Sequence, residues 1–146
     1  MKRLIYFFSL VLCLGLTSCG DPMQKLEDLL DELKSEGKNM DVEQWENFYL
    51  SVAEAQLSFW QSNPTKSEIN KFDKLGEKFS DQIRKISEKE KAEKNMKKAQ
   101  KNLNKDDEFL DLNDDISCAR KKAMRRADNK KKGGMDDDDD DEEDDE

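Results

Sequence analysis

Apolar residues recur at intervals of three and four positions along this chain, and that spacing limits its fold more than any other feature. The longest run is Ile69, Phe72, Leu75, Phe79, Ile83 and Ile86. Such spacing places the side chains on one face of a coiled-coil-like α-helix. Charged residues make up 42% of the chain and hydrophobic residues 34%, so the core must be thin. No strand-like alternation follows residue 19, and the sequence therefore predicts an all-α fold.

Local signals indicate where the helices begin and end. We predict a small antiparallel helical bundle with helices near residues 22–36, 42–62 and 66–88. Gly37 is well placed to end the first helix. Capping boxes mark the starts of the second and third helices: Asp41 with Gln44, and Thr65 with Glu68. Gly76 lies inside the third helix, where glycine costs about 1 kcal/mol relative to alanine.

Beyond Ile86 the chain is highly charged and its apolar stripe thins. We assign residues 89–128 to a charged extension, which is either one long charged helix or a helical hairpin. Charge favours the hairpin, because residues 84–101 carry a net charge of +5 and residues 105–115 a net charge of −5. A turn at residues 102–104 would align two rows of opposite charge: Lys91, Lys94, Lys97 and Lys98 beside Asp106, Asp107, Asp111 and Asp114. Exposed pairs contribute only ~0–1 kcal/mol each, but a row of them can set the register.

The net charge of −9 is concentrated at one end of the chain. Residues 136–146 are eleven consecutive acids, whereas Arg120–Lys132 holds eight basic residues and one acid. We predict that residues 129–146 form a disordered tail that is first basic and then acidic. The acids could attract Ca²⁺ or Mg²⁺ weakly, but nothing in the run would fix a defined cation site. The basic run could pair with the acidic run, bind anionic head groups or remain a solvated face.

The beginning of the chain carries a targeting pattern. A positively charged Met1-Lys2-Arg3 precedes an apolar segment, residues 4–14, that is too short to span a bilayer comfortably; Leu16-Thr17-Ser18-Cys19 then follows. This arrangement resembles the signal peptide and lipobox of bacterial lipoproteins. The resemblance implies cleavage before Cys19, a diacylglyceryl group on its thiol, and a further acyl chain such as palmitate on its amine. The alternative is an ordinary secreted protein that is cut near Ser18.

With this resemblance the chain divides into five parts. They are a signal peptide (1–18), a lipid anchor and linker (19–21), a helical bundle (22–88), the charged extension (89–128) and the tail (129–146). The lipid on Cys19 would tether the protein to a membrane of the cell envelope. Gly20 stands where lipoproteins retained at the inner membrane carry aspartate, and Asp21 is the only acid near the anchor. The resemblance therefore favours the outer membrane, and its periplasmic face over surface display.

The composition leaves little for catalysis or cofactor binding. The chain has no histidine, and its serines have no accompanying base and orienting group. If one cysteine leaves with the signal peptide and Cys19 carries lipid, Cys118 remains alone, and we expect it to be buried as a small hydrophobe. Residues 111–115 resemble a calcium loop superficially, but Ile116 and Lys122 stand where an EF-hand needs glycine and glutamate. We predict a protein that is not an enzyme, with no catalytic residues, cofactor or metal site.

Two further patterns bear on the partners. The basic runs Lys89–Lys101 and Arg120–Lys132 contain no aromatic residue for base stacking, so we predict no nucleic-acid binding. Six aromatic residues could line a ligand groove, but at helical spacing they are better explained as core: Trp45, Phe48, Phe59, Trp60, Phe72 and Phe79. We expect a membrane-tethered, non-catalytic binding or scaffold protein with an unidentified protein partner. The alternative is a holdase-like periplasmic chaperone, in which the charged hairpin grips unfolded cargo.

Replacement of Cys19 by serine should release the protein from membranes. The acyl chains are expected on this one residue, and a single chain gives only marginal binding, so the whole anchor depends on the thiol. Fractionation of cells that express the Cys19→Ser variant measures the effect. Variant protein in the membrane pellet would show that another segment, such as an uncleaved signal peptide, holds the chain there.

Overall fold

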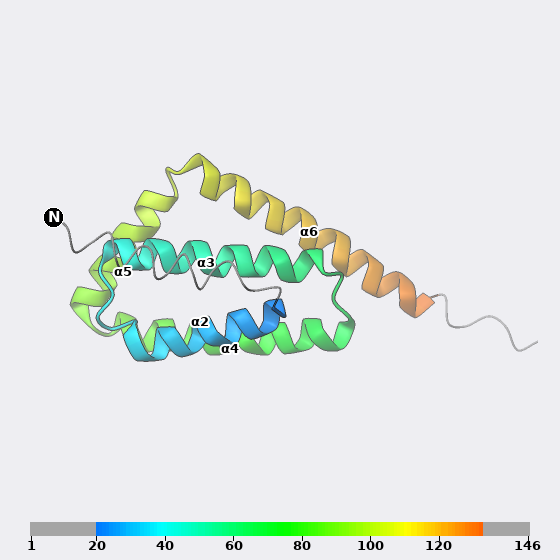
Figure 1. Cartoon of the computed structure of the whole chain (residues 1–146), viewed down its shortest axis with the longest axis horizontal. Coiled ribbons are helices and arrows are strands. Elements are labelled where there is room, and N and C mark those ends of the chain that lie inside the picture. Colours follow the sequence, from blue (N-terminus) through cyan, green and yellow to red (C-terminus); the bar gives the residue numbers. More distant parts are fainter. Residues whose placement is uncertain (1–19, 133–146) are drawn as a thin grey trace, which may run out of the picture.

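A computed structural model describes residues 20–132, which form an all-α structure without strands in that range (Figure 1). The described helices are α2 (Pro22–Glu36), α3 (Val42–Gln61), α4 (Lys66–Ser87), α5 (Glu90–Leu103) and α6 (Asp107–Lys132). The predicted fold class is confirmed, and the predicted bounds of the first three helices are within one residue of those observed. Cys19 and the acidic run 136–146 lie outside the described residues.

Both capping boxes are present as the sequence predicted. At the start of α3, the Gln44 backbone N–H donates to Asp41 Oδ1 at 2.9 Å, and the Asp41 N–H donates to Gln44 Oε1 at 2.9 Å. At the start of α4, the Thr65 N–H donates to Glu68 Oε2 at 2.7 Å. Hydrogen bonds from Thr65 lower the pKa of the Glu68 carboxyl, because they favour its charged form. Short-range chemistry thus fixes both helix starts.

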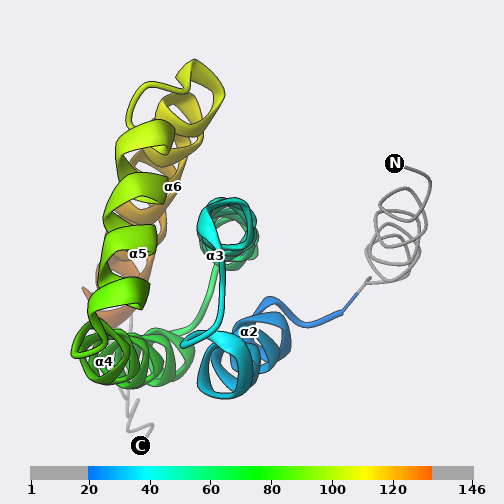
Figure 2. The same ribbon diagram turned by 90° about the vertical axis from the view of Figure 1, so that its left-hand side faces the viewer.

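Helix α3 has the most neighbours, because it lies against α2, α5 and α6. α2 lies against α3 and also against α4, whereas α5 and α6 pack on a different side of α3 from α2 (Figure 2). The four buried leucines of α2 face this core: Leu26, Leu29, Leu30 and Leu33. They pack with Trp45 and Phe48 of α3 and with Leu75 and Ile86 of α4. The three helices therefore share one apolar seam.

The helix is interrupted at residues 88–89, so α4 and α5 do not form the one long charged helix that was the alternative to a hairpin. α5 starts afresh at Glu90 and buries four residues: Ala92, Met96, Ala99 and Leu103. Ala92 and Ala99 are 1% and 0% exposed, so the thin apolar stripe of this segment marks a close approach to α3. The predicted boundary at residue 88 does not coincide with the end of core contacts, because Ala92, Met96 and Ala99 belong to the same cluster as the α2 leucines.

The chain does turn near the predicted position, between Leu103 and Asp107, but α5 and α6 diverge from that turn (Figure 1), and the proposed ladder of opposite charges is not formed. Among the described residues, no ion pair joins the α5 lysines to the acids that open α6. Lys94 and Lys97 instead pair with Glu90 and Glu93 of their own helix. α6 packs on α3, because burial of apolar surface there outweighs exposed pairs worth ~0–1 kcal/mol each.

Gly37 ends α2 for a reason of space. Its φ of −52° is ordinary, so the position does not require the left-handed region. The nearest obstacle to a Cβ atom there is the backbone oxygen of Leu33, and Cδ1 of Ile86 would lie 2.5 Å away. The Ile86 side chain can shift but the backbone of α2 cannot, so the end of α2 itself demands a residue without a side chain.

Replacement of Trp45 should destabilise the body strongly. The side chain is 0% exposed, and truncation to alanine at such a site costs about 3–5 kcal/mol. Among the described residues, its Nε1 has no hydrogen-bond partner, so Trp45→Phe removes an unsatisfied donor and keeps much of the ring. We expect Trp45→Phe to cost less than half as much as Trp45→Ala. Urea unfolding followed by circular dichroism measures both, and equal stabilities of Trp45→Ala and the unchanged protein would place this ring outside the core.

Candidate functional site

An apolar groove runs between α3 and α4. We call it the α3–α4 groove; it encloses about 300 Å³. Its lining residues are Leu26, Phe48, Tyr49, Val52, Gln56, Phe72, Leu75, Gly76, Phe79, Ser80 and Ile83. Leu26 from α2, Phe48 and Leu75 are buried and form the floor. Phe72 and Phe79, in the wall formed by α4, are only half-buried, so part of their apolar surface remains accessible to a ligand.

The groove exists because α3 and α4 both pack on α2 and do not close on each other. Gly76 lies at the middle of the α4 wall and contributes no side chain. A Cβ atom at this position would meet no atom within 4 Å. No internal contact therefore requires a glycine here, although glycine lowers helix stability by about 1 kcal/mol relative to alanine. The absent side chain leaves room above the helix backbone.

The residues that line the groove come from α2, α3 and α4, and none of them belongs to α5 or α6. α5 lies near one end, where Met96 and Ala99 belong to the cluster that includes Trp45 and Phe48. α6 lies near the other end, where Ala123 belongs to a cluster with Phe59, Trp60 and Ile69. The groove is thus a short channel with a helix near each end.

The hydroxyl of Tyr49 ties one wall of the groove to α5. Gln100 Nε2 donates to this hydroxyl at 3.2 Å. Partial burial raises the pKa of the Tyr49 phenol, and the hydrogen bond from Gln100 opposes that shift by favouring the phenolate. The phenol therefore reports on the contact between α5 and the groove.

The six aromatic residues singled out from the sequence take two roles. Trp45, Phe48, Phe59 and Trp60 are buried, as the core interpretation expected. Phe72 and Phe79 are only half-buried, and they line the groove. Phe72 stacks on Phe59, with ring centroids 4.5 Å apart. The core interpretation was therefore incomplete, and it overlooked Gly76, whose position within an apolar stripe was the one available signal.

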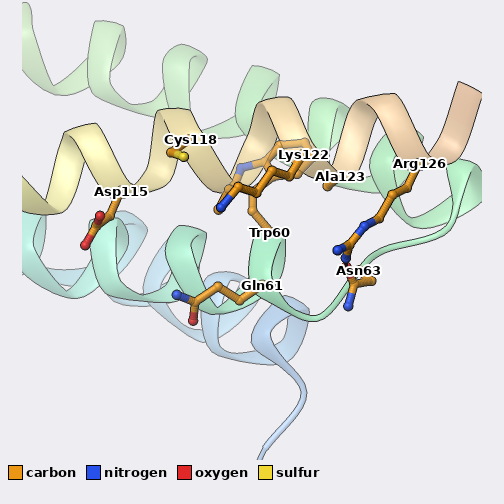
Figure 3. Close-up of a pocket in the computed structure, with 9 residues that line it drawn as sticks. Trp60, Gln61, Asn63, Asp115, Cys118, Lys122, Ala123 and Arg126 are labelled. Carbon is orange, nitrogen blue, oxygen red and sulfur yellow. Dashed lines mark hydrogen bonds between the residues drawn. The ribbon is translucent and has the colours of Figure 1, made fainter.

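A second hollow lies at the contact of α3 with α6 and encloses about 280 Å³ (Figure 3). Lys122 and Arg126 extend from α6 towards it, and Trp60 lies beneath them. Arg126 donates a hydrogen bond to Asn63 Oδ1, and Asn63 has a φ of 56° just after the end of α3. Asparagine tolerates this left-handed conformation better than most residues. The guanidinium of Arg120 lies 5.5 Å from the centroid of the Trp60 ring.

Cys118 is exposed, so the prediction of a buried cysteine was wrong. The contact face of α6 is formed by Ile116, Ala119, Ala123 and Ala127. Cys118 immediately precedes Ala119, and one residue turns the side chain by about 100° away from that face. The residue lines the second hollow and is otherwise open to solvent.

The described residues form a mostly apolar groove, and they contain neither a metal-binding group nor a membrane-spanning helix. Within residues 20–132, no group of three or more His, Cys, Asp or Glu side chains could hold a metal ion. A search of the same range finds no helix with the length and apolar character needed to cross a membrane. The groove presents aromatic and aliphatic side chains with a few polar groups, a combination that suits an apolar ligand or side chains of a partner.

Comparison with known proteins identifies no relative. No family model, curated protein or solved structure matches the chain.

Titration of Tyr49 should show its contact with α5. The chain has two tyrosines, so a Tyr6→Phe variant leaves Tyr49 as the only phenol. Ultraviolet absorbance follows the ionisation of the phenol, and we expect the pKa of Tyr49 to lie above the usual value of about 10. Gln100→Leu should raise this pKa further, because the variant loses the hydrogen bond that favours the phenolate. Gln24→Leu on α2 is the control and should leave the pKa unchanged.

The raised pKa also sets the direction of a stability change. The unfolded phenol ionises at a lower pH than the folded one, so the contribution of Tyr49 to stability is complete below about pH 10 and is lost as the pH rises through the folded pKa. An ordinary midpoint in the folded protein would mean that Tyr49 is open to solvent and that the groove wall is not formed as described.

Proposed function

We propose that this protein is a lipid-anchored, non-catalytic binding protein of the cell envelope, and that it holds an amphipathic helix of a partner protein in the α3–α4 groove. One observation carries the proposal: an open, aromatic-lined groove in a chain that is poor in apolar residues. Within the described range, the large hydrophobic residues that are exposed outside the groove are Leu110 and Met124, at 43% and 40%. Accessible apolar surface gathered at one place is typical of a binding site.

The shape of the groove favours a helix as its occupant. Amphipathic helices dock by laying an apolar stripe into such a groove. The exposed backbone at Gly76 would allow a close approach. Helix α5 at one end has a net charge of +3, and residues 119–128 of α6, around Ala123 at the other end, have a net charge of +4. A partner helix with acids at both of its ends would match this charge.

The lipid anchor on Cys19 is part of the same proposal. The described body begins at Gly20, and α2 starts two residues later. Met23 packs with the Phe59, Trp60 and Ala123 cluster, so the start of α2 lies at the α6 end of the groove. An anchor at Cys19 would hold that end nearest the membrane. We place the protein at the periplasmic face of the outer membrane, as the lipobox resemblance implies.

Substitution of Gly76 tests whether the groove binds a partner. Gly76→Trp should fill the channel without breaking an internal contact, because no atom lies within 4 Å of a Cβ at this position. Gly76→Ala is the matched control: it leaves the channel open and should stabilise the helix by about 1 kcal/mol. A photo-crosslinker at Phe79 in intact cells should capture the same partner in the unchanged protein and in Gly76→Ala, but not in Gly76→Trp. Capture that is equal in all three proteins would disprove the use of the groove.

The alternative is a holdase-like chaperone, which the same open groove also supports. A holdase accepts many unfolded chains, whereas a helix receptor selects one partner. If the purified protein suppresses aggregation of unrelated denatured proteins and Gly76→Trp removes that activity, the alternative is correct. A single cross-linked partner without such suppression supports the helix receptor.

A further inference from the structure

Part of α6 carries a group of cations that form no ion pair with the described acidic residues. We call Lys121, Lys122, Arg125 and Arg126 the α6 cationic face. All four residues are exposed. No ion pair within residues 20–129 joins any of them to a carboxylate. Such a group of uncompensated charges marks a surface that attracts an anion.

The four residues occupy adjacent positions around the helix. At 3.6 residues per turn they spread over a continuous sector beside the contact face, which is centred on Ala123. Figure 3 shows Lys122 and Arg126 on the same side of α6. The hydrogen bond from Arg126 to Asn63 uses one nitrogen of its guanidinium, so other N–H groups are available to a carboxylate. Arg120 lies apart, over Trp60.

We propose that the acidic segment 136–146 of the same chain docks on the α6 cationic face. The segment carries eleven carboxylates and begins four residues after the end of α6. Lys121 precedes Lys132 by eleven residues, a distance of about 17 Å along a helix. Eleven extended residues reach about 36 Å, so a reversal at Gly133-Gly134 would bring the acids back along the whole face.

Covalent attachment makes this segment the favoured occupant. A short flexible joint gives an effective concentration in the millimolar range, without any partner in solution. The contacts would be exchanging ion pairs, screened beyond about 8 Å at physiological salt. An anionic membrane would have to displace the segment and would be repelled by its charge. The docked segment therefore shields the face from other anions.

Competition with a separate acidic peptide tests the proposal on the full chain. The probe is a labelled peptide with the sequence of residues 136–146. The comparison is a neutral variant, in which each Asp of 136–146 is replaced by Asn and each Glu by Gln. The segment then keeps its length and loses its charge. For an effective concentration of about 1 mM and a peptide Kd of about 0.1 mM, the peptide should bind this neutral variant about ten-fold more tightly than the unchanged chain. The difference should shrink as salt rises.

Substitutions in the neutral variant then locate the site. Lys121→Gln, Lys122→Gln and Arg125→Gln together should remove peptide binding, and they leave the bond of Arg126 to Asn63 intact. The matched control removes three exposed lysines of α5 that form no ion pair with any described residue: Lys91, Lys98 and Lys101. These changes to Gln should keep most of the affinity.

Three results would overturn the proposal. The first is equal affinity of the peptide for the unchanged chain and the neutral variant. The second is an equal loss from the α5 substitutions, which would mean attraction by overall charge. The third is a neutral variant that binds anionic but not uncharged vesicles through the face and ignores the peptide, because that result would assign the face to a membrane surface.

Discussion

The contact between the apolar faces of α2 and α3 is the one on which the rest of the structure depends, because α4 packs on α2 and both α5 and α6 pack on α3. Four leucines of α2 are buried, and they are shared between α3 and α4. Large aliphatic side chains each contribute about 1.5–3 kcal/mol when fully buried, and this chain has few of them. Because α3 and α4 both lie on α2, each presents its remaining apolar side chains towards the other across a gap. The groove follows from how the limited core is shared.

Small side chains decide where the other helices can lie. α5 approaches α3 through Ala92 and Ala99, and α6 approaches it through Ala119 and Ala123. Alanine permits a short distance between helix axes but buries little area, so these contacts position a helix at lower gain than the leucines of α2. The α3–α4 groove stays uncovered between α5 and α6, since none of its lining residues belongs to either of these helices. The space is most open above Gly76 of α4, where a Cβ atom would meet no described atom within 4 Å.

The first three helices could be predicted because their ends depend on local chemistry. Features that depend on contacts between distant segments could not be predicted. The capping boxes at Asp41 and Thr65 use residues three positions apart, and both form as expected. The break after Ser87 and the buried alanines of α5 depend on α3, which no local pattern specifies. The charge ladder was a wrong expectation because exposed pairs are too weak to compete with apolar contacts on α3. The groove also could not be predicted from the sequence, because the spacing of Phe72 along α4 is the same for a core residue and for a residue that lines a groove.

Helix α6 connects the two proposed surfaces. Its contact face packs near one end of the groove, and its cationic face lies on an adjoining side of the same helix. The helix is held by alanines, by Ile116 and by the bond of Arg126 to Asn63. A change that loosens this contact would therefore alter both surfaces at once and could not tell them apart. Exposed residues such as Lys121 and Arg125 can be changed without touching the contact, and Gly76 lies on a different helix. The two surfaces can thus be separated experimentally although one helix borders both.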